Sequence, residues 1–311
     1  MDPLYTYFGH HKCASSWIWA ILAQICREAG LVHKIMVDPL TPTGHGPLTD
    51  YMADQIPRHD LGRYLEQRGY DFVSFVTADM EMVEALRMPF KGFHVIRDPR
   101  DIIVSAYFSH RNSHPTDNLP HLAAHRERLK SVSKEEGLFL EMEFSGQELR
   151  DLGDWNYQHP DILELKMEEV TRHPYESFVR IFEFLDLLRW ESDFLAKDRV
   201  QTFLQGLMNR LSFRAPHWQR LRRPMRPTGD IVLGRVYDNR FEKKAGGRAK
   251  GKADAKSHYR KGKAGDWRNH LTPAHIAHFK ETYPGLVSTL GYETDESWEL
   301  ETHALEADVG P

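Results

Sequence analysis

The sequence has few cysteines, no long hydrophobic run and no recognisable leader, and each shortage excludes a class of protein. Its 311 residues contain only two cysteines, Cys13 and Cys26, too few for the disulfide framework of a small secreted domain. We expect both to be reduced thiols in a cytoplasmic protein. No apolar run reaches the ~18 residues that a membrane-spanning helix requires. The N-terminus has neither a basic nor an apolar region, so no signal peptide is predicted.

An excess of charge of one sign is also missing. The chain has 41 Lys and Arg against 45 Asp and Glu, which gives a formal net charge of −4. This balance does not attract nucleic acid or an anionic membrane, so neither is expected as a partner. The 18 histidines are many, but none is spaced like the paired ligands of a helical zinc motif. We therefore expect no metal.

The sequence does contain alternating strand-like and helix-like segments. This alternation predicts an α/β fold of three layers, with a central parallel sheet covered by helices on both faces. We expect a single domain over residues 1–291, a mobile basic segment at 242–265 and a loose acidic tail at 292–311. The predicted strands are Leu4–Phe8, Asp71–Val76, Gly92–Ile96 and Ile162–Lys166, and the predicted helices begin near Ser15, Leu61, Met80, Asp98 and Tyr175, with a charged helical stretch from Leu119 to Leu152.

The first segment with a chemical signature lies between the first predicted strand and helix. It reads Gly-His-His-Lys-Cys-Ala-Ser-Ser-Trp from Gly9 to Trp17. A helix N-terminus presents unpaired N–H groups and the positive end of the helix dipole, which together bind anions. Lys12 adds a positive charge and the two serines add hydroxyl donors. The alternative is that Ser15 or Ser16 only caps the helix. The order of residues is not that of a Walker loop.

A second segment, from Gly92 to Ser105, joins a strand end to a helix. It contains Arg-Asp-Pro-Arg-Asp followed by Ser105, eight residues after Arg97. Open parallel sheets bind ligands at this end of their strands, and a guanidinium suits bidentate contact with a phosphate. The alternative is a buried Arg–Asp pair beside a capped helix. A third segment, from Tyr259 to Thr272, combines cations, glycines and a tryptophan. Taken alone, this composition is typical of a solvated basic linker.

Together these three segments resemble the signature of the PAPS-dependent sulfotransferase family, in the family's order. Lys12 to Trp17 resembles Lys-Ser-Gly-Thr-Thr-Trp with Cys and Ala at its second and third positions, and the third segment resembles Arg-Lys-Gly-x-x-Gly-Asp-Trp. The resemblance implies a donor, 3′-phosphoadenosine 5′-phosphosulfate (PAPS), and a product, adenosine 3′,5′-bisphosphate (PAP). It implies a 5′-phosphosulfate site at Lys12, Cys13, Ala14, Ser15 and Ser16, a 3′-phosphate site at Arg97, Ser105, Arg260, Lys261 and Gly262, and an adenine site between Trp17 and Phe213. For Trp17 and Phe213, the alternative is ordinary packing in the core.

The resemblance also implies direct in-line transfer of a sulfuryl group to a hydroxyl or amine, with Lys12 stabilising the leaving phosphate. The family's Lys-x-His segment is missing, because Ser74 to Asp79 contains neither residue. Asp79 and His11 are therefore the candidate bases, with Asp79 alternatively capping a helix. Three more histidines from loops are further candidates: His59, His110 and His114.

Two other functions stay open at this point: a non-catalytic protein that binds PAPS or PAP, and an ATP-dependent small-molecule kinase. The kinase would need a Walker loop and a metal-binding acid, and neither is evident. The acceptor is expected to be a small molecule, lipid or carbohydrate. The family's dimer segment is incomplete, since Pro273 and Ala277 replace its Val and Glu, so the oligomeric state is left open.

Overall fold

The computed structural model describes residues 3–37, 49–51, 61–117, 119–190, 196–248 and 264–299. In these residues six parallel strands form one sheet in the order β3-β2-β4-β1-β5-β6. The predicted α/β fold with a central parallel sheet is confirmed. The sequence did not reveal β2 and β3. The strands are β1 (Leu4–Phe8), β2 (His33–Val37), β3 (Thr49–Tyr51), β4 (Phe72–Phe75), β5 (Phe90–Ile96) and β6 (Ile162–Lys166).

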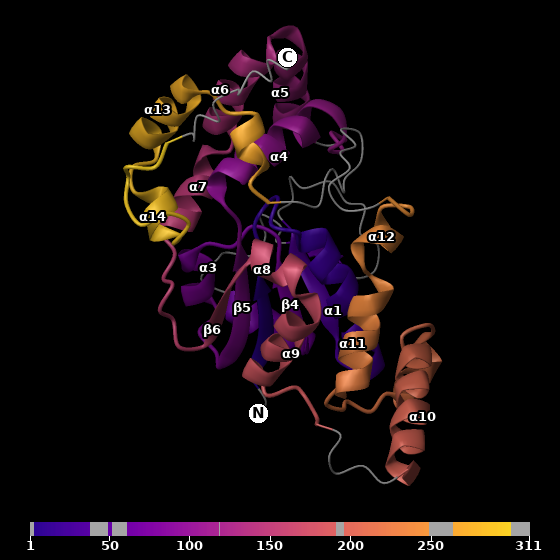
Figure 1. Cartoon of the computed structure of the whole chain (residues 1–311). Coiled ribbons are helices and arrows are strands. Elements are labelled where there is room, and N and C mark those ends of the chain that lie inside the picture. Colours follow the sequence, from indigo (N-terminus) through magenta and orange to yellow (C-terminus); the bar gives the residue numbers. More distant parts are fainter. Residues whose placement is uncertain are drawn as a thin grey trace, which may run out of the picture.

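Helices cover both faces of the sheet and extend beyond the C-terminal ends of its strands (Figure 1). The first half of the chain contributes α1 (Ser15–Ala29), α2 (Leu61–Arg68), α3 (Met80–Ala85), α4 (Pro99–Asn112), α5 (Pro120–Ser131), α6 (Lys134–Phe144) and α7 (Gly146–Gly153). The second half contributes α8 (Met167–Arg172), α9 (Pro174–Phe184), α10 (Ala196–Ser212), η4 (Pro216–Leu221), α11 (Gly229–Asp238), α12 (Phe241–Lys244), η5 (Asp266–Asn269), α13 (Pro273–Thr282) and α14 (Leu286–Thr289).

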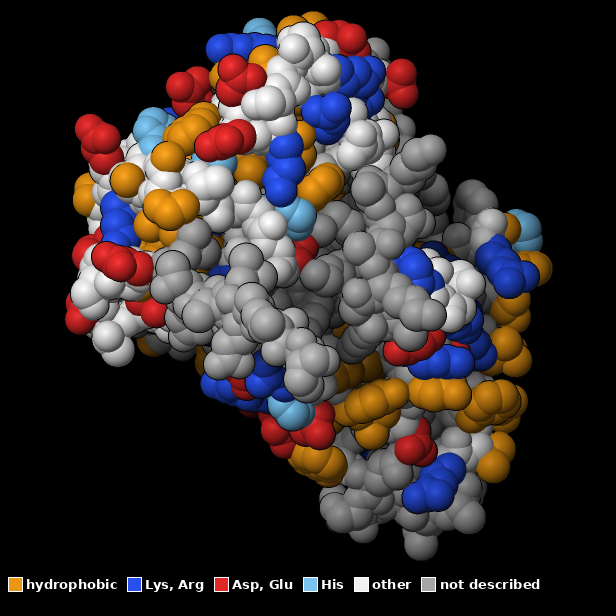
Figure 2. Space-filling model, turned by 45° about the horizontal axis from the view of Figure 1, so that its top comes forward, with side chains coloured by type: hydrophobic (Ala, Val, Ile, Leu, Met, Phe, Trp, Pro, Cys, Tyr) orange, Lys and Arg blue, Asp and Glu red, His pale blue; other side chains and the backbone are white. Residues whose placement is uncertain are grey.

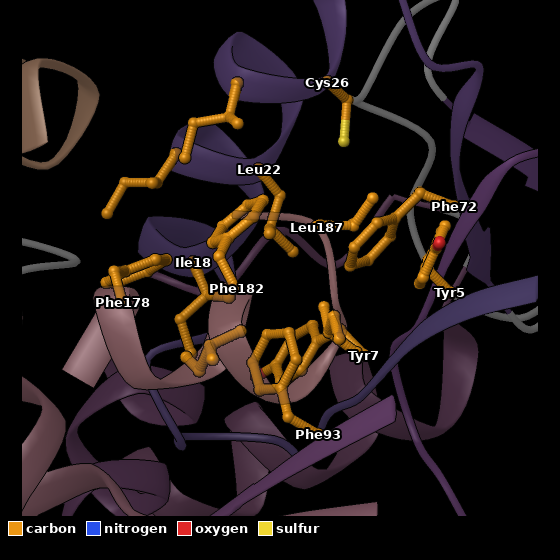
Figure 3. Packing of buried hydrophobic residues seen from close by; sticks show 14 of the residues in the cluster. Tyr5, Tyr7, Ile18, Leu22, Cys26, Phe72, Phe93, Phe178, Phe182 and Leu187 are labelled. Carbon is orange, nitrogen blue, oxygen red and sulfur yellow. The ribbon is translucent and has the colours of Figure 1, made fainter. Parts of the chain in front are cut away.

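The largest hydrophobic cluster lies between the sheet and the helices α1, α9 and α11. Figure 3 shows Tyr7 and Phe93 of neighbouring strands beside residues of α1 and α9. The rings of Tyr7 and Phe93 stack with centroids 4.8 Å apart. Full burial of each large apolar side chain contributes roughly 1.5–3 kcal/mol. A second cluster, which includes Phe8, Phe75 and Met82, packs α2 and α3 on the opposite face, and these two clusters fix the sheet between its helical layers.

A third cluster joins α4, α6, α7, α13 and α14 into a helical layer above the strand ends. In Figure 1 these helices gather at the top of the molecule, over the C-terminal edge of the sheet. The expected loose tail is wrong for its first residues. Trp298 is buried, and Tyr292 and Glu293 bond to the body of the protein. Aromatic residues in this acidic segment give it an apolar surface to bury.

The sequence also did not reveal α11, which buries Val232 and Val236 against the main core. Exposed large hydrophobic side chains gather over α10 and α11 (Figure 2), namely Val200, Phe203, Leu204, Leu233 and Tyr237. Among the described helices, none has both the length and the apolar character needed to cross a membrane.

Candidate functional site

The loop between β1 and α1 begins at a glycine that packs closely against the end of β4. Gly9 follows β1, and a Cβ at this position would lie 2.8 Å from the carbonyl oxygen of Phe75. Only glycine fits against β4 here. Lys12 and Ala14 then adopt left-handed backbone conformations, with φ of 65° and 62°. Such values are uncommon for residues with a Cβ and mark a local strain that functional loops often carry.

The N-terminus of α1 is not capped by any side chain among the described residues. Ala14 occupies the N-cap position and makes no side-chain bond, so the capping alternative for the serines is wrong. The hydroxyl of Ser15 instead donates to the carbonyl of His10 at 2.9 Å and lies 3.2 Å from the hydroxyl of Tyr7. The N–H groups that open a helix therefore remain available for a bound anion.

A buried polar network holds the loop from below. Nε2 of His10 lies 2.8 Å from Nε2 of His94, and Nδ1 of His94 lies 2.7 Å from a carboxylate oxygen of Glu164. Because Nδ1–H of His94 faces the carboxylate, its Nε2 accepts the proton of His10. Burial lowers the pKa of His10 well below its usual value, so this ring stays neutral. His10 thereby fixes the start of the loop to β5.

Lys12 lies at the centre of the loop and points toward α4. Its Nζ donates to Oγ of Ser109 at 2.6 Å. Burial lowers the pKa of Lys12 to about 8, although Glu141 and Glu148 nearby act in the opposite direction. Lys12 is thus a partly buried cation that, among the described residues, donates to a neutral hydroxyl, which a more negative group can replace.

Arg97 follows β5 and reaches back to the same loop. Its side chain is 7% exposed, and Nη1 donates to the carbonyl of Lys12 at 3.0 Å. Nε is buried and has no hydrogen-bond partner among the described residues. Leaving such a donor unsatisfied costs about 1–3 kcal/mol, which a bound anion would recover. Ser105 lies on α4 one turn before Ser109, on the face that meets Lys12.

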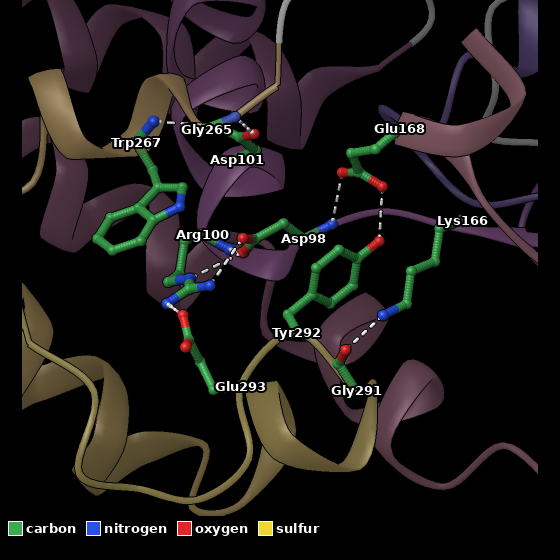
Figure 4. A network of polar contacts seen from close by, with 10 residues as sticks. All are labelled: Asp98, Arg100, Asp101, Lys166, Glu168, Gly265, Trp267, Gly291, Tyr292 and Glu293. Carbon is green, nitrogen blue, oxygen red and sulfur yellow. Dashed lines mark hydrogen bonds and ion pairs between the residues drawn. The ribbon is translucent and has the colours of Figure 1, made fainter. Parts of the chain in front are cut away.

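The expected alternative, a buried Arg–Asp pair, exists but does not involve Arg97. Asp98 instead binds Arg100 through Nε and Nη2 at 2.9 and 2.8 Å, and its carboxylate caps α4 by accepting from the N–H of Arg100. Arg100 also lies over the ring of Trp267 (Figure 4) and over that of Trp298. Arg97 is therefore left without a carboxylate partner in the described hydrogen bonds.

The basic residues of the third segment, Arg260, Lys261 and Gly262, lie outside the described residues. The end of that segment is described. The N–H groups of Gly265 and Trp267 donate to the carboxylate of Asp101 at 2.6 and 2.9 Å (Figure 4). Asp101 lies in the first turn of α4, four residues after Arg97. The end of the third segment is thus attached to the first turn of α4, within the second segment.

The structure does not bring Trp17 and Phe213 together. Phe213 follows α10, where Asn209 donates to the carbonyl of Glu28 at the far end of α1. Eleven residues of helix between Trp17 and Glu28 span about 16 Å. The indole N–H of Trp17 instead donates to the carbonyl of Asn239 at 2.8 Å, and its ring packs against Phe178. The turn that follows α11 therefore takes the place expected for the segment around Phe213.

The two candidate bases differ in their surroundings. Asp79 caps α3, because its carboxylate accepts from the N–H of Met82 at 2.7 Å; this is the alternative role that the sequence allowed. His11 lies in the loop, where its backbone N–H donates to Glu148. Burial raises the pKa of Glu148 to about 7. Nδ1 of His11 is 3.8 Å from Glu148, too long for a hydrogen bond.

The spacing of residues in the sequence did not predict a histidine cluster that lies next to Lys12. The ring of His110 stacks on that of His11 with centroids 5.0 Å apart. Glu141, which is fully buried, accepts from His110, His125 and Ser145, each at 2.9 Å. These residues come from α4, α5 and α6, so no short motif joins them. Two sets have ligating atoms within 4.8 Å of one another, as metal sites do: His11 with His110 and His114, and His110 with His125 and Glu141.

A scan against protein-family models and a search of curated proteins both give no match for this chain. Among solved structures, it is similar to mouse sulfotransferase SULT7A1 complexed with PAP, with 17% identity, a TM-score of 0.45, and coverage of 92% of this chain and 83% of that chain. It is also similar to retinol dehydratase with androsterone and the inactive cofactor PAP (14%, 0.43, 92% and 81%) and with retinol and PAP (15%, 0.38, 92% and 82%). At these identities the likeness concerns the fold.

Proposed function

We propose that this protein transfers a sulfuryl group from PAPS to a hydroxyl or amine of an acceptor. The observation that carries the proposal is the uncapped N-terminus of α1, which opens between two cations, Lys12 and Arg97. Neither cation is paired to a carboxylate in the described hydrogen bonds. An anion with two separated phosphate groups suits two cationic positions at one edge of a parallel sheet better than a single phosphate does.

Each part of the donor has residues of matching chemistry. The N–H groups at the start of α1, with Ser15 and Ser16, suit the 5′-phosphate and the sulfate oxygens. Arg97, with its unpartnered Nε, and Ser105 suit the 3′-phosphate. Arg260, Lys261 and Gly262 belong to the same site in this proposal, because Asp101 ties the end of their segment to α4. In this proposal adenine binds beside Trp17, whose indole N–H donates to the carbonyl of Asn239 after α11.

The reaction requires positioning and charge stabilisation from this chain. PAPS supplies the sulfuryl group: the acceptor oxygen bonds to sulfur as the bond from sulfur to the 5′-phosphate oxygen breaks, PAP leaves, and the acceptor proton passes to a base. Lys12 places its ammonium at the oxygen where negative charge develops. Ser109 holds Lys12 in this direction before the donor arrives. Arg97 braces the loop through the carbonyl of Lys12.

Replacement of Lys12 by alanine tests this assignment. We expect Lys12→Ala to lower transfer from sulfur-labelled PAPS by at least about 10²-fold, the usual effect of losing one transition-state donor. Binding of PAP, measured by calorimetry, should change far less, because PAP lacks the sulfate and the bridging bond. Lys130→Ala, which removes an exposed lysine paired only with Glu127, is the control and should match the wild type.

Two outcomes would contradict the proposal in different ways. If Lys12→Ala transfers the sulfuryl group from PAPS at the wild-type rate, Lys12 has no role in the chemical step. Wild-type protein that binds PAP tightly but transfers nothing, to any acceptor or to water, would identify a non-catalytic PAP-binding protein.

A further inference from the structure

The acceptor must lose a proton, and the histidine cluster beside Lys12 contains a residue suited to take it. His110 follows Ser109, whose hydroxyl holds the ammonium of Lys12. Burial lowers the pKa of His110, and the nearby charge of Lys12 acts in the same direction. A ring nitrogen of His110 lies within 4.8 Å of ring nitrogens of His11 and His114. His110 is buried and packs directly against the Lys12 loop through the ring of His11.

Glu141 fixes the orientation and tautomer of His110. Nδ1 of His110 lies 2.9 Å from Oε1 of Glu141. The carboxylate is fully buried and also accepts from Ser145 and His125, so three helices determine its position. A carboxylate only accepts hydrogen bonds, so Nδ1 carries the proton and Nε2 carries the lone pair. Since the two nitrogens lie on different sides of the ring, Nε2 faces away from Glu141.

These contacts also account for the cluster without a metal ion. Both oxygens of Glu141 are occupied by donors at ordinary hydrogen-bond distances. Hydrogen bonds from two imidazoles and a hydroxyl satisfy a buried carboxylate, and the pKa of Glu141 is lowered by His110 and His125 despite burial, which acts most strongly and in the opposite direction. The cluster is a hydrogen-bonded relay that holds one imidazole in place.

The other candidate bases are less well held. Nδ1 of His11 is 3.8 Å from Glu148, and that carboxylate already accepts from the backbone of His11. Asp79 is occupied as the N-cap of α3. A general base works best when its lone pair is fixed toward the substrate, and the 2.9 Å bond between Nδ1 of His110 and Glu141 fixes the lone pair of His110.

We propose that His110 is the general base of the reaction, and that Glu141 is a positioning residue acting through it; this rests on the proposed function. Nε2 of His110 accepts the proton of the acceptor hydroxyl or amine as the new bond to sulfur forms. The imidazolium that results is stabilised by the carboxylate of Glu141. The proton later leaves to solvent, so the residue returns to its neutral form.

Replacing His110 by glutamine tests the proposal without a known acceptor. The probes are two phenols, acidic para-nitrophenol and weakly acidic para-cresol, with water as a third acceptor followed by PAP release. We expect His110→Gln to reduce transfer to para-cresol and to water by about 10²–10⁴-fold and transfer to para-nitrophenol much less, because that phenol ionises without help. His121→Gln, which alters an exposed histidine on α5, is the control and should not differ from wild type.

The pH profile separates a base from a merely structural histidine. Groups facing His110 come from three elements and the loop. They are Glu141 on α6, His125 and Arg126 on α5, Lys12 and His11 in the loop, and His114 after α4. Removing one negative charge with Glu141→Gln should lower the pKa of His110 further. The rising limb of kcat/KM should move by roughly one unit or more to lower pH, with reduced kcat and unchanged PAP binding.

Calorimetry with PAP distinguishes failure of this proposal from failure of the proposed function. Failure of the wild type to bind PAP would overturn the proposed function itself. Intact PAP binding with equal losses for both phenols in His110→Gln would overturn the base, as would a rising limb that disappears in His11→Gln but persists in His110→Gln. Loss of activity with a chelator and recovery with Zn²⁺ would identify a metal cluster and overturn the relay. Wild-type PAP binding without transfer to any probe would also overturn it.

Discussion

At the scale of single residues, the site depends on cations that the fold leaves without anionic partners. Lys12 has a strained left-handed backbone, and its ammonium bonds to a hydroxyl and not to a carboxylate. Nε of Arg97 has no hydrogen-bond partner in the described part of the chain, while the neighbouring Arg100 binds the carboxylate of Asp98. Such unsatisfied groups cost stability, so their presence at one edge of the sheet points to a ligand.

The lowered pKa of Lys12 predicts how activity depends on pH. Burial lowers this pKa to about 8, so the free enzyme holds the ammonium below that pH and loses it above. In the proposed reaction only the ammonium form of Lys12 can stabilise the leaving oxygen. We therefore expect kcat/KM for PAPS to fall about tenfold per pH unit above roughly pH 8, and Lys12→Arg, which remains charged, to remove that falling limb. A profile that stays flat to pH 10 in the wild type would contradict this role.

Residues differ in how far the sequence predicts them. The placement of Lys12 and Arg97 after β1 and β5 was predictable, because each follows a strand in a motif of fixed spacing, and their roles toward a donor stay a prediction. The placement of Phe213 was not predictable, because its motif of three residues does not specify which end of α1 it reaches. The pair of His110 and Glu141 could not be found from spacing, since 31 residues separate them and only the packing of α4 against α6 joins them.

At the scale of elements, Asp101 links the start of α4 to the segment before η5. Its carboxylate accepts from two backbone N–H groups, those of Gly265 and Trp267. Burial raises the pKa of Asp101, although both bonds oppose the shift. This side chain therefore fixes the positions of Gly265 and Trp267 beside the first turn of α4.

Removing this carboxylate should loosen the segment. Each hydrogen bond to a charged group contributes about 1.5–3 kcal/mol, so Asp101→Ala should lower the free energy of unfolding by about 3 kcal/mol, measured by urea denaturation, and weaken PAP binding. Glu127→Ala, which removes an exposed ion pair, should change stability by less than about 1 kcal/mol. Equal stability of the two variants would show that Asp101 anchors nothing.

Elements with strong periodicity were predictable, and the others were missed for physical reasons. The predicted strands Leu4–Phe8 and Ile162–Lys166 have the same bounds as β1 and β6, and the helix predicted to begin near Leu61 begins there as α2. β2 was missed because it begins with His33 and Lys34. His33 is nevertheless buried, since its Nε2 pairs with the hydroxyl of Ser74 on β4 at 2.8 Å. Only this cross-strand partner makes the histidine compatible with the sheet.

At the scale of the whole molecule, three segments far apart in the sequence meet at one edge. In the sheet, β1 lies between β4 and β5. Because these three strands are parallel, their C-terminal ends lie on the same side, and the loop after β1 begins there. Ligands of open α/β sheets bind in this position. The helical layer of α4 to α7 then covers the edge (Figure 1), which supplies Ser109, His110 and Glu141 to the same region.

The central claim, a donor site built around a 3′-phosphate, is tested most directly by calorimetry with PAP, 5′-AMP and ATP. We predict that PAP binds much more tightly than the two other nucleotides. Arg97→Ala should weaken PAP binding about ten- to hundredfold, the expected loss for a charged hydrogen-bonded contact, while leaving the affinity for 5′-AMP nearly unchanged. Equal affinity of the wild type for PAP and 5′-AMP, or a preference for ATP, would contradict the account.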